Sequence, residues 1–216
     1  MKKIDYKFWN LGTFIYQTKA PDHVVKRLLD EGNKKLESYN KSLAGHIKQQ
    51  FLYDKETIIW FYTEMKDYWN SWRDKQCAFN GFINHHIDLQ AFELWVNYMK
   101  KGEFNPLHTH SGDLSFVLYL DYPKKLYEES HDHKGKSPPP GSISFNFTHS
   151  SSDRWFNYGT HSVPETGDLL IFPAQLNHMV LPFKSDVTRV SVSGNLHVSN
   201  KKELGENNGW FQSQSW

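Results

Sequence analysis

The chain has 216 residues, which is enough for one domain with a substantial hydrophobic core and too few for a second domain of ordinary size. Lys and Arg number 25 and acidic residues 24, so the net charge is +1 and no basic surface for nucleic acid is indicated. A single cysteine, Cys77, excludes an internal disulfide and favours a reducing compartment. Since the sequence has no signal-like apolar run and no membrane-length one, it predicts a cytoplasmic protein with no membrane partner.

Two helices are expected in the first 90 residues. Apolar residues at helical spacing predict the first helix from Pro21 to Tyr39, with Gly32 as a point where it bends or breaks. A second helix, rich in aromatic residues, is predicted from Lys55 to Arg73. Neither helix can bury its apolar stripe alone, so both are expected to lie against one side of a sheet.

From residue 91 the apolar period changes to two, which is typical of strands. Short apolar runs bounded by turn residues predict a mainly β fold, a sandwich or a barrel. The polar stretch Lys124–Pro140 between them is expected to be a mobile surface loop. The predicted strands are Ala91–Met99, Leu114–Leu120, Ile143–Phe147, Leu169–Phe172 and Val187–Val192.

The first candidate metal ligands are His108 and His110, followed by Asp113 behind the turn Ser111-Gly112. Residues i and i+2 of a strand point to the same side, so the two imidazoles can chelate one ion. A bare His-x-His also fits a pair of surface histidines on a polar strand end. A further histidine, His178, follows the predicted buried strand Leu169–Phe172 and strengthens the reading as a metal site.

A second polar feature is the strand that contains Arg189, Ser191, Ser193 and Asn195 on one face. If this face is exterior, it is simply solvated. If it is interior, it offers the guanidinium fork and hydroxyl groups that bind a carboxylate.

The order His-x-His, then Gly-Asp-Leu-Leu-Ile-Phe-Pro and His178, then Arg-x-Ser eleven residues later resembles the 2-oxoglutarate and Fe(II)-dependent oxygenases. The resemblance covers roughly residues 91–197. It implies a double-stranded β-helix (jelly roll), with residues 1–90 as a helical buttress, 91–200 as the core and 201–216 as a polar tail of one domain. His108 and His178 match the two histidine ligands of Fe(II), and Arg189 with Ser191 matches the pair that holds the distal carboxylate of 2-oxoglutarate.

One departure from the family pattern leaves the third metal ligand open. The family usually has His-x-Asp or His-x-Glu, and this sequence has His110 at the acidic position. Either three histidines bind the metal, or Asp113 reaches it across the turn. Strand alternation favours His110, whereas the charge of Fe(II) favours Asp113. Among further residues, Tyr98 and Tyr119 are candidates to hydrogen-bond the cosubstrate, and Asn105 and Asn195 are candidates to support the site.

The activity that the resemblance implies is hydroxylation of a substrate C–H bond with O₂ and 2-oxoglutarate. The substrate is expected to be a small molecule or a side chain, and its identity is not encoded in any motif. The alternative is a cupin-like metal-binding jelly roll without 2-oxoglutarate, because five residues separate Gly102 from His108-Thr109-His110 as in a cupin motif. In the cupin pattern an acidic residue follows the histidines by four or five residues, and this sequence has none there. Arg189 also has no role in that pattern.

Overall fold

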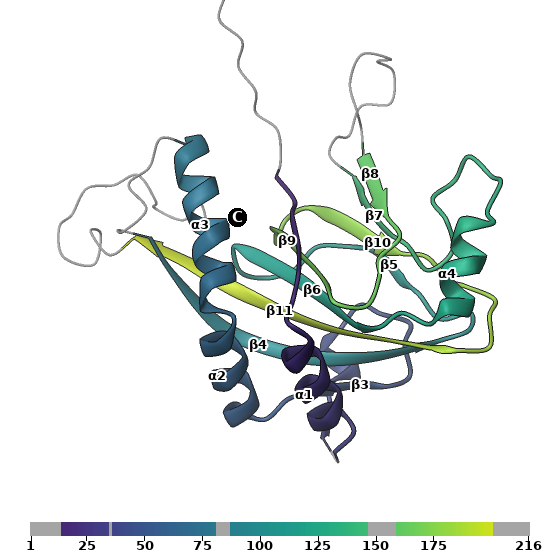
Figure 1. Cartoon of the computed structure of the whole chain (residues 1–216), viewed down its shortest axis with the longest axis horizontal. Coiled ribbons are helices and arrows are strands. Elements are labelled where there is room, and N and C mark those ends of the chain that lie inside the picture. The colour runs from purple at the N-terminus through teal and green to yellow at the C-terminus, as the bar shows by residue number, and fades with distance from the viewer. Residues whose placement is uncertain (1–13, 35, 81–86, 147–158, 201–216) are drawn as a thin grey trace, which may run out of the picture.

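The computed structural model describes residues 14–34, 36–80, 87–146 and 159–200. Its centre is two antiparallel sheets (Figure 1). The larger sheet has the order β1-β9-β6-β11-β4-β3-β2 and the smaller one the order β5-β10-β7-β8. The larger sheet consists of β1 (Tyr16–Lys19), β2 (Glu37–Ser38), β3 (Gln50–Leu52), β4 (Ile87–Lys100), β6 (Leu114–Asp121), β9 (Asp168–Pro173) and β11 (Thr188–Asn200). The smaller sheet consists of β5 (Asn105–His108), β7 (Ile143–Asn146), β8 (Gly159–Ser162) and β10 (Asn177–Val180).

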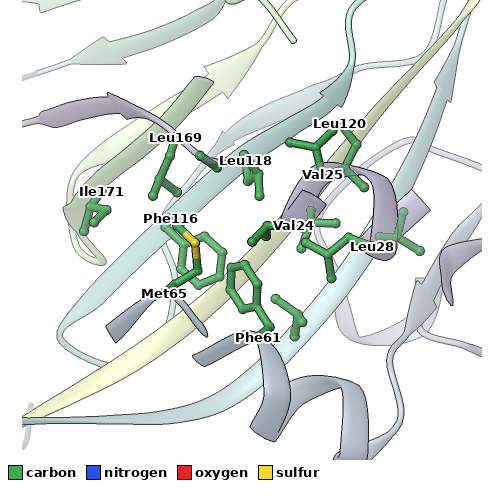
Figure 2. Close-up of a cluster of buried hydrophobic side chains, with 14 of the residues drawn as sticks. Val24, Val25, Leu28, Phe61, Met65, Phe116, Leu118, Leu120, Leu169 and Ile171 are labelled. Carbon is green, nitrogen blue, oxygen red and sulfur yellow. The ribbon is translucent and has the colours of Figure 1, made fainter. Parts of the chain in front are cut away.

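Three helices, α1 (Asp22–Gly32), α2 (Lys55–Glu64) and α3 (Lys66–Asn80), lie along the larger sheet on the side away from the smaller one (Figure 1). Their apolar faces form one core with the outer face of the sheet. Figure 2 shows this core, in which Phe61 and Met65 lie next to Phe116. Val24 and Val25 of α1 lie near Leu118 and Leu120 of β6. The helices therefore buttress the sheet, as their amphipathic pattern predicts.

A second core fills the space between the two sheets. Inward residues of the larger sheet, such as Val117 and Phe172, pack there with Ile143, Phe145 and others from the smaller sheet. The polar functional residues described below lie at one side of this second core. The fold is the mainly β jelly roll with N-terminal helices that the sequence resemblance implies, and the fold class is therefore confirmed.

The boundaries of both predicted helices differ from the predictions. The first helix ends at Gly32, the residue where the sequence indicates a bend or break. Gly32 packs so closely that a Cβ atom there would lie 2.8 Å from the Tyr98 hydroxyl. The second predicted helix is two helices with Met65 at their junction. The first of these, α2, is capped by Asp54, whose Oδ1 accepts from Thr57 N at 2.7 Å.

The prediction of a loop over Lys124–Pro140 is wrong in its first half, which forms the helix α4 (Lys124–His131). Its sequence is polar, but Leu126 is buried in the second core and Glu129 accepts hydrogen bonds from the backbone N–H groups of Lys184 and Ser185, each at 2.8 Å. These long-range contacts stabilise a helix that the local pattern does not indicate.

The N-terminal segment also contributes strands to the larger sheet, namely β1 and β3. The structural division between helical buttress and β core is therefore less sharp than the expected boundary at residue 90. Within the described residues, none of the helices combines the length and apolar character needed to cross a membrane. The predicted tail, 201–216, lies outside the described residues, as does Phe147 at the end of a predicted strand.

Candidate active site

The site begins with a pair of histidines on neighbouring strands of the smaller sheet. His108 at the end of β5 is the register partner of His178 on β10. Each ring is held by its own Nδ1, which lies 2.7 Å from the carbonyl oxygen of Pro106 for His108 and 2.8 Å from that of Leu176 for His178. When Nδ1 donates to a carbonyl, the lone pair of the imidazole is on Nε2. Both rings therefore present Nε2 as a ligand atom.

His110 joins this pair from the segment that follows β5. Its backbone N–H donates to Ala174 O at 2.9 Å, and its Nε2 lies 3.2 Å from Nε2 of His178. The ligand atoms of His108, His110 and His178 all lie within 4.8 Å of one another. Among the described residues, these three form the group of metal-ligating side chains that is compact enough for one ion.

Electrostatics keep these histidines in the neutral form that binds metals. Burial, together with repulsion between the imidazoles, lowers the pKa of His110 to about 3 and that of His178 to about 4. Burial also lowers the pKa of His108. His178 is 3% exposed and packs against Phe172, with ring centroids 4.8 Å apart. At neutral pH the cluster consists of three uncharged imidazoles beside an apolar wall.

Arg189 on β11 lies in the same pocket and is only 2% exposed. Its Nη1 donates to Gly141 O at 3.1 Å, while its Nε has no partner in the described part of the chain. Burial lowers the pKa of Arg189, yet a guanidinium stays charged at neutral pH. No ion pair of the described residues includes Arg189. A buried cation without an anionic partner is unfavourable, so this position is suited to receive an anion.

Two hydroxyl groups lie next to Arg189. Ser191 follows it on the inner face of β11 and is the register partner of Tyr119 on β6. The hydroxyl of Tyr119 is buried and has no hydrogen-bond partner among the described residues, and its ring lies 5.5 Å from the guanidinium carbon. Burial raises the pKa of Tyr119, so its hydroxyl is a donor at neutral pH.

One pocket connects the three histidines with Arg189. The inner face of the larger sheet forms one wall and the smaller sheet forms the other. Residues Leu43–Gly45, which precede β3, close one side. The structure thus brings together His108, His110, His178, Arg189, Ser191 and Tyr119 from the sequence-predicted set, and Asn105 with them.

Other predicted residues lie elsewhere. Asp113 is about half exposed, and its Oδ2 accepts from Val198 N at 2.8 Å at the far end of β11, so it is outside the histidine group. Tyr98 points to the helix side of β4, where its hydroxyl bonds to Asn33 at 3.3 Å. Adjacent residues of a strand face opposite sides of the sheet. Asn97 faces the pocket, so its neighbour Tyr98 does not. Asn195 bonds to Ser115 and Glu93 and does not line the pocket.

The sequence analysis did not name Gln50, Trp95 or Asn97 as site residues, and all three line the pocket. Gln50 lies on the short strand β3, which has no clear alternation of its own. Trp95 and Asn97, however, alternate with Leu94 and Val96 in β4. A buried polar residue on the side opposite the apolar stripe was the available signal for Asn97.

The geometry defines a jelly roll with three convergent imidazoles and a buried arginine between its sheets. Residues 93–195 match the family model described as putative 2OG-Fe(II) oxygenase. This match supports the resemblance to the 2-oxoglutarate and Fe(II)-dependent oxygenases that the sequence motifs indicate. No curated protein matches the chain.

Solved structures with the same fold include a prolyl-4-hydroxylase of Pseudomonas putida, with 16% identity, a TM-score of 0.52 and coverage of 85% of this chain and 91% of that one. A viral collagen prolyl hydroxylase from Paramecium bursaria Chlorella virus-1, in complex with 2-oxoglutarate, has 13% identity, a TM-score of 0.52 and coverage of 86% and 96%. HygX from Streptomyces hygroscopicus, bound to nickel, 2-oxoglutarate and hygromycin B, has 10% identity, a TM-score of 0.50 and coverage of 87% and 83%. At these identities the likeness concerns the fold.

Fe(II) and 2-oxoglutarate, the cofactor and cosubstrate of the family, suit the chemistry of the pocket. Three neutral imidazoles can bind a divalent ion and leave other coordination positions open. The unpaired Nε of Arg189 and the unpaired hydroxyl of Tyr119 are donors that a carboxylate would satisfy.

Proposed function

We propose that this protein is a hydroxylase that uses Fe(II), O₂ and 2-oxoglutarate to oxidise a C–H bond of a small molecule or of a side chain. One observation carries the proposal. Three imidazoles whose ligand atoms converge and a buried arginine without an anionic partner among the described residues line the same pocket. This separation of a metal site and a carboxylate site is what a bridging keto acid requires.

In this proposal His108, His110 and His178 hold the iron. The hydrogen bonds from Nδ1 of His108 and His178 to backbone carbonyls orient these two rings and increase their basicity. All three ligands are neutral, so the bound ion keeps its full 2+ charge. The dianionic cosubstrate, rather than a protein carboxylate, then offsets that charge.

Arg189 binds the distal carboxylate of 2-oxoglutarate through its guanidinium, while the hydroxyls of Ser191 and Tyr119 donate to the same group. The Gly141 carbonyl accepts from Nη1 and so fixes the orientation of the guanidinium. Gly141 has φ of +71°, a conformation that glycine adopts without strain, and a side chain there would also crowd Leu126.

The apolar residues of the pocket exclude water from the reacting atoms. Ile143, Phe172 and Val180 surround the histidines and lower the local polarity. When bound, Fe(II) supplies the redox chemistry by which O₂, 2-oxoglutarate and a substrate R–H become succinate, CO₂ and R–OH. The side chains position the cosubstrate and shield the reaction from solvent.

The proposal is tested with protein purified without a polyhistidine tag, because a tag would itself bind metal. Stoichiometric iron is expected after anaerobic reconstitution with Fe(II). Addition of 2-oxoglutarate should then produce a visible charge-transfer band, and admission of O₂ should yield succinate. Iron binding without any response to 2-oxoglutarate would contradict the oxygenase and would favour the cupin-like alternative.

A further inference from the structure

The pocket has a third wall that neither the metal nor the cosubstrate explains. Three amide side chains form it: Gln50 from β3, Asn97 from β4 and Asn105 from β5. We call these residues the amide wall. Gln50 and Asn97 are 1% and 4% exposed, so two of the three are fully buried polar groups. A buried amide is stable only when its N–H and C=O groups have hydrogen-bond partners.

The amide wall is connected across the larger sheet. Gln50 is the register partner of Asn97, and its Nε2 donates to Asn97 Oδ1 at 2.7 Å. Asn97 is in turn the register partner of Ser191, next to Arg189. The wall thus continues the polar row of the proposed cosubstrate site to the opposite side of the pocket.

The hydrogen bonds of the wall are incomplete. Among the described residues, Nδ2 of Asn97 donates to Ser191 O and Ser193 Oγ, both at 3.5 Å, beyond the usual length of such bonds. Oδ1 of Asn105 is buried and has no partner among the described residues. An unpaired buried acceptor is unfavourable unless a ligand supplies a donor. The wall therefore offers one free acceptor and one poorly used donor.

The backbone at Gly45 brings two of these amides together. A Cβ atom on Gly45 would lie 2.2 Å from Asn105 Oδ1 and 3.2 Å from Gln50 Nε2, so a side chain at this position would displace both groups. The segment Leu43–Gly45 thus closes over the amides without filling the space between them. Glycine at this position is what leaves both amides their place in the wall.

The cosubstrate cannot satisfy the free acceptor. At neutral pH 2-oxoglutarate carries two carboxylates and a ketone, all of which accept hydrogen bonds and none of which donates one. A donor for Asn105 must come from another molecule. Among the described residues that line the pocket, Arg189 is the only Lys, Arg, Asp or Glu, and it is assigned to 2-oxoglutarate. The amide wall itself carries no charge, so the group that binds it is uncharged.

Trp95 adds an apolar surface beside the wall. It lies two residues before Asn97 on the same face of β4, and its ring centroid is 5.8 Å from that of His110. A flat ring between the amides and the histidines is suited to contact the carbon skeleton of a substrate. The substrate would then lie with its polar group on the wall and a C–H bond toward the metal site.

We propose that the amide wall is the substrate-recognition site, and that the substrate presents an uncharged amide whose N–H donates to Asn105 and whose carbonyl accepts from Asn97. The inference rests on the proposed function for its orientation toward the metal. A peptide and a small-molecule amide share this chemistry.

The test uses zinc-loaded protein labelled with ¹⁵N and follows the side-chain NH₂ signals of Asn and Gln by NMR. The probe is N-acetylglycine N-methylamide, an uncharged diamide, titrated with and without 2-oxoglutarate. It should shift the Gln50, Asn97 and Asn105 signals, identified by their loss in single variants. Acetate and methylammonium should leave these signals in place. Tighter binding of the diamide than of acetamide would point to a peptide, and equal binding to a small molecule.

Two variants separate recognition from folding. Asn105→Ala removes an oxygen with no internal partner, so the melting temperature should hold while probe affinity falls by about 3- to 10-fold. Gln50→Glu should also weaken the probe, whereas Gln49→Glu, on the exposed neighbouring residue, should not. Unshifted wall signals, or full affinity in Asn105→Ala, would overturn the amide assignment. Absence of 2-oxoglutarate binding would instead count against the proposed function.

Discussion

His108 and His178 face each other across two antiparallel strands, and each ring is fixed by a bond from its Nδ1 to the carbonyl oxygen two residues earlier in the chain. The same hydrogen bond from Nδ1 to a backbone carbonyl thus occurs in two paired residues of neighbouring strands. It points both Nε2 atoms into the pocket before any ion binds. An arrangement fixed in this way loses little side-chain freedom on metal binding, which favours a tight site.

The first prediction concerns His178. His178→Ala should abolish stoichiometric iron binding, because it removes the most buried of the three imidazoles from the centre of the cluster. Iron content after anaerobic reconstitution measures the loss, and circular dichroism checks that the β fold remains. Retention of iron by this variant would remove His178 from the metal site.

The matched control for that experiment is the double variant His131→Ala, His133→Ala. These residues form a ligand-like His-Asp-His sequence, but both are outside the histidine cluster. His131 bonds to Tyr127 O at the end of α4, and His133 contacts Ser137. The double variant should keep its iron. A loss of iron here would show that the ion binds beside α4 instead.

The second prediction concerns Arg189→Lys. Lysine keeps the charge but has no planar fork to donate two parallel bonds, and it would leave Gly141 O without its present donor. Affinity for 2-oxoglutarate should fall by about 30- to 150-fold, equivalent to about 2–3 kcal/mol, while iron affinity stays within error. Anaerobic titration of the charge-transfer band measures the first quantity. An equal loss of iron would indicate a general collapse of the pocket.

The sequence predicted the strands of the core and the helical cover well, because both depend on local apolar periodicity. The sequence also named the three histidines, Arg189 and Ser191 as site residues from their order along the chain. The structure places them in one pocket, and their roles stay predictions. The helix α4 was missed, since its stability comes from Glu129 and the distant backbone of Ser185. Such contacts have no local signal.

The assembly of the amide wall also has no signal in the local sequence. Gln50, Asn97 and Asn105 come from three separate strands, and only the register between β3 and β4 and the fold-back of β5 bring them together. The strand that contains Tyr98 was predicted correctly, but its alternation does not tell which face lies toward the pocket. The helices cover the face of Leu94 and Val96, and Tyr98 lies on that same face.

The third prediction distinguishes His110 from Asp113 as the third ligand. His110→Ala should weaken iron binding strongly, because it removes an imidazole whose Nε2 lies 3.2 Å from that of His178. Asp113→Ala should keep the iron and lose about 1 kcal/mol of stability or less, since its carboxylate accepts from Val198 N at an exposed position. Iron affinity and thermal unfolding are measured for both. The reverse pattern of iron loss would establish a two-histidine, one-carboxylate site.

The last prediction concerns Tyr119→Phe. Its hydroxyl is fully buried without a partner, so removal of the oxygen should leave stability unchanged or raise it slightly in the absence of ligands. If that hydroxyl donates to 2-oxoglutarate, as its position beside Arg189 supports, the variant should bind the cosubstrate about 3- to 10-fold more weakly. Tyr122→Phe is the matched control, because its hydroxyl already has a partner in Ser130 at 3.0 Å. That control should lose stability and keep its affinity for 2-oxoglutarate. A destabilised Tyr119→Phe with normal affinity would show that the hydroxyl has a structural partner and no part in binding.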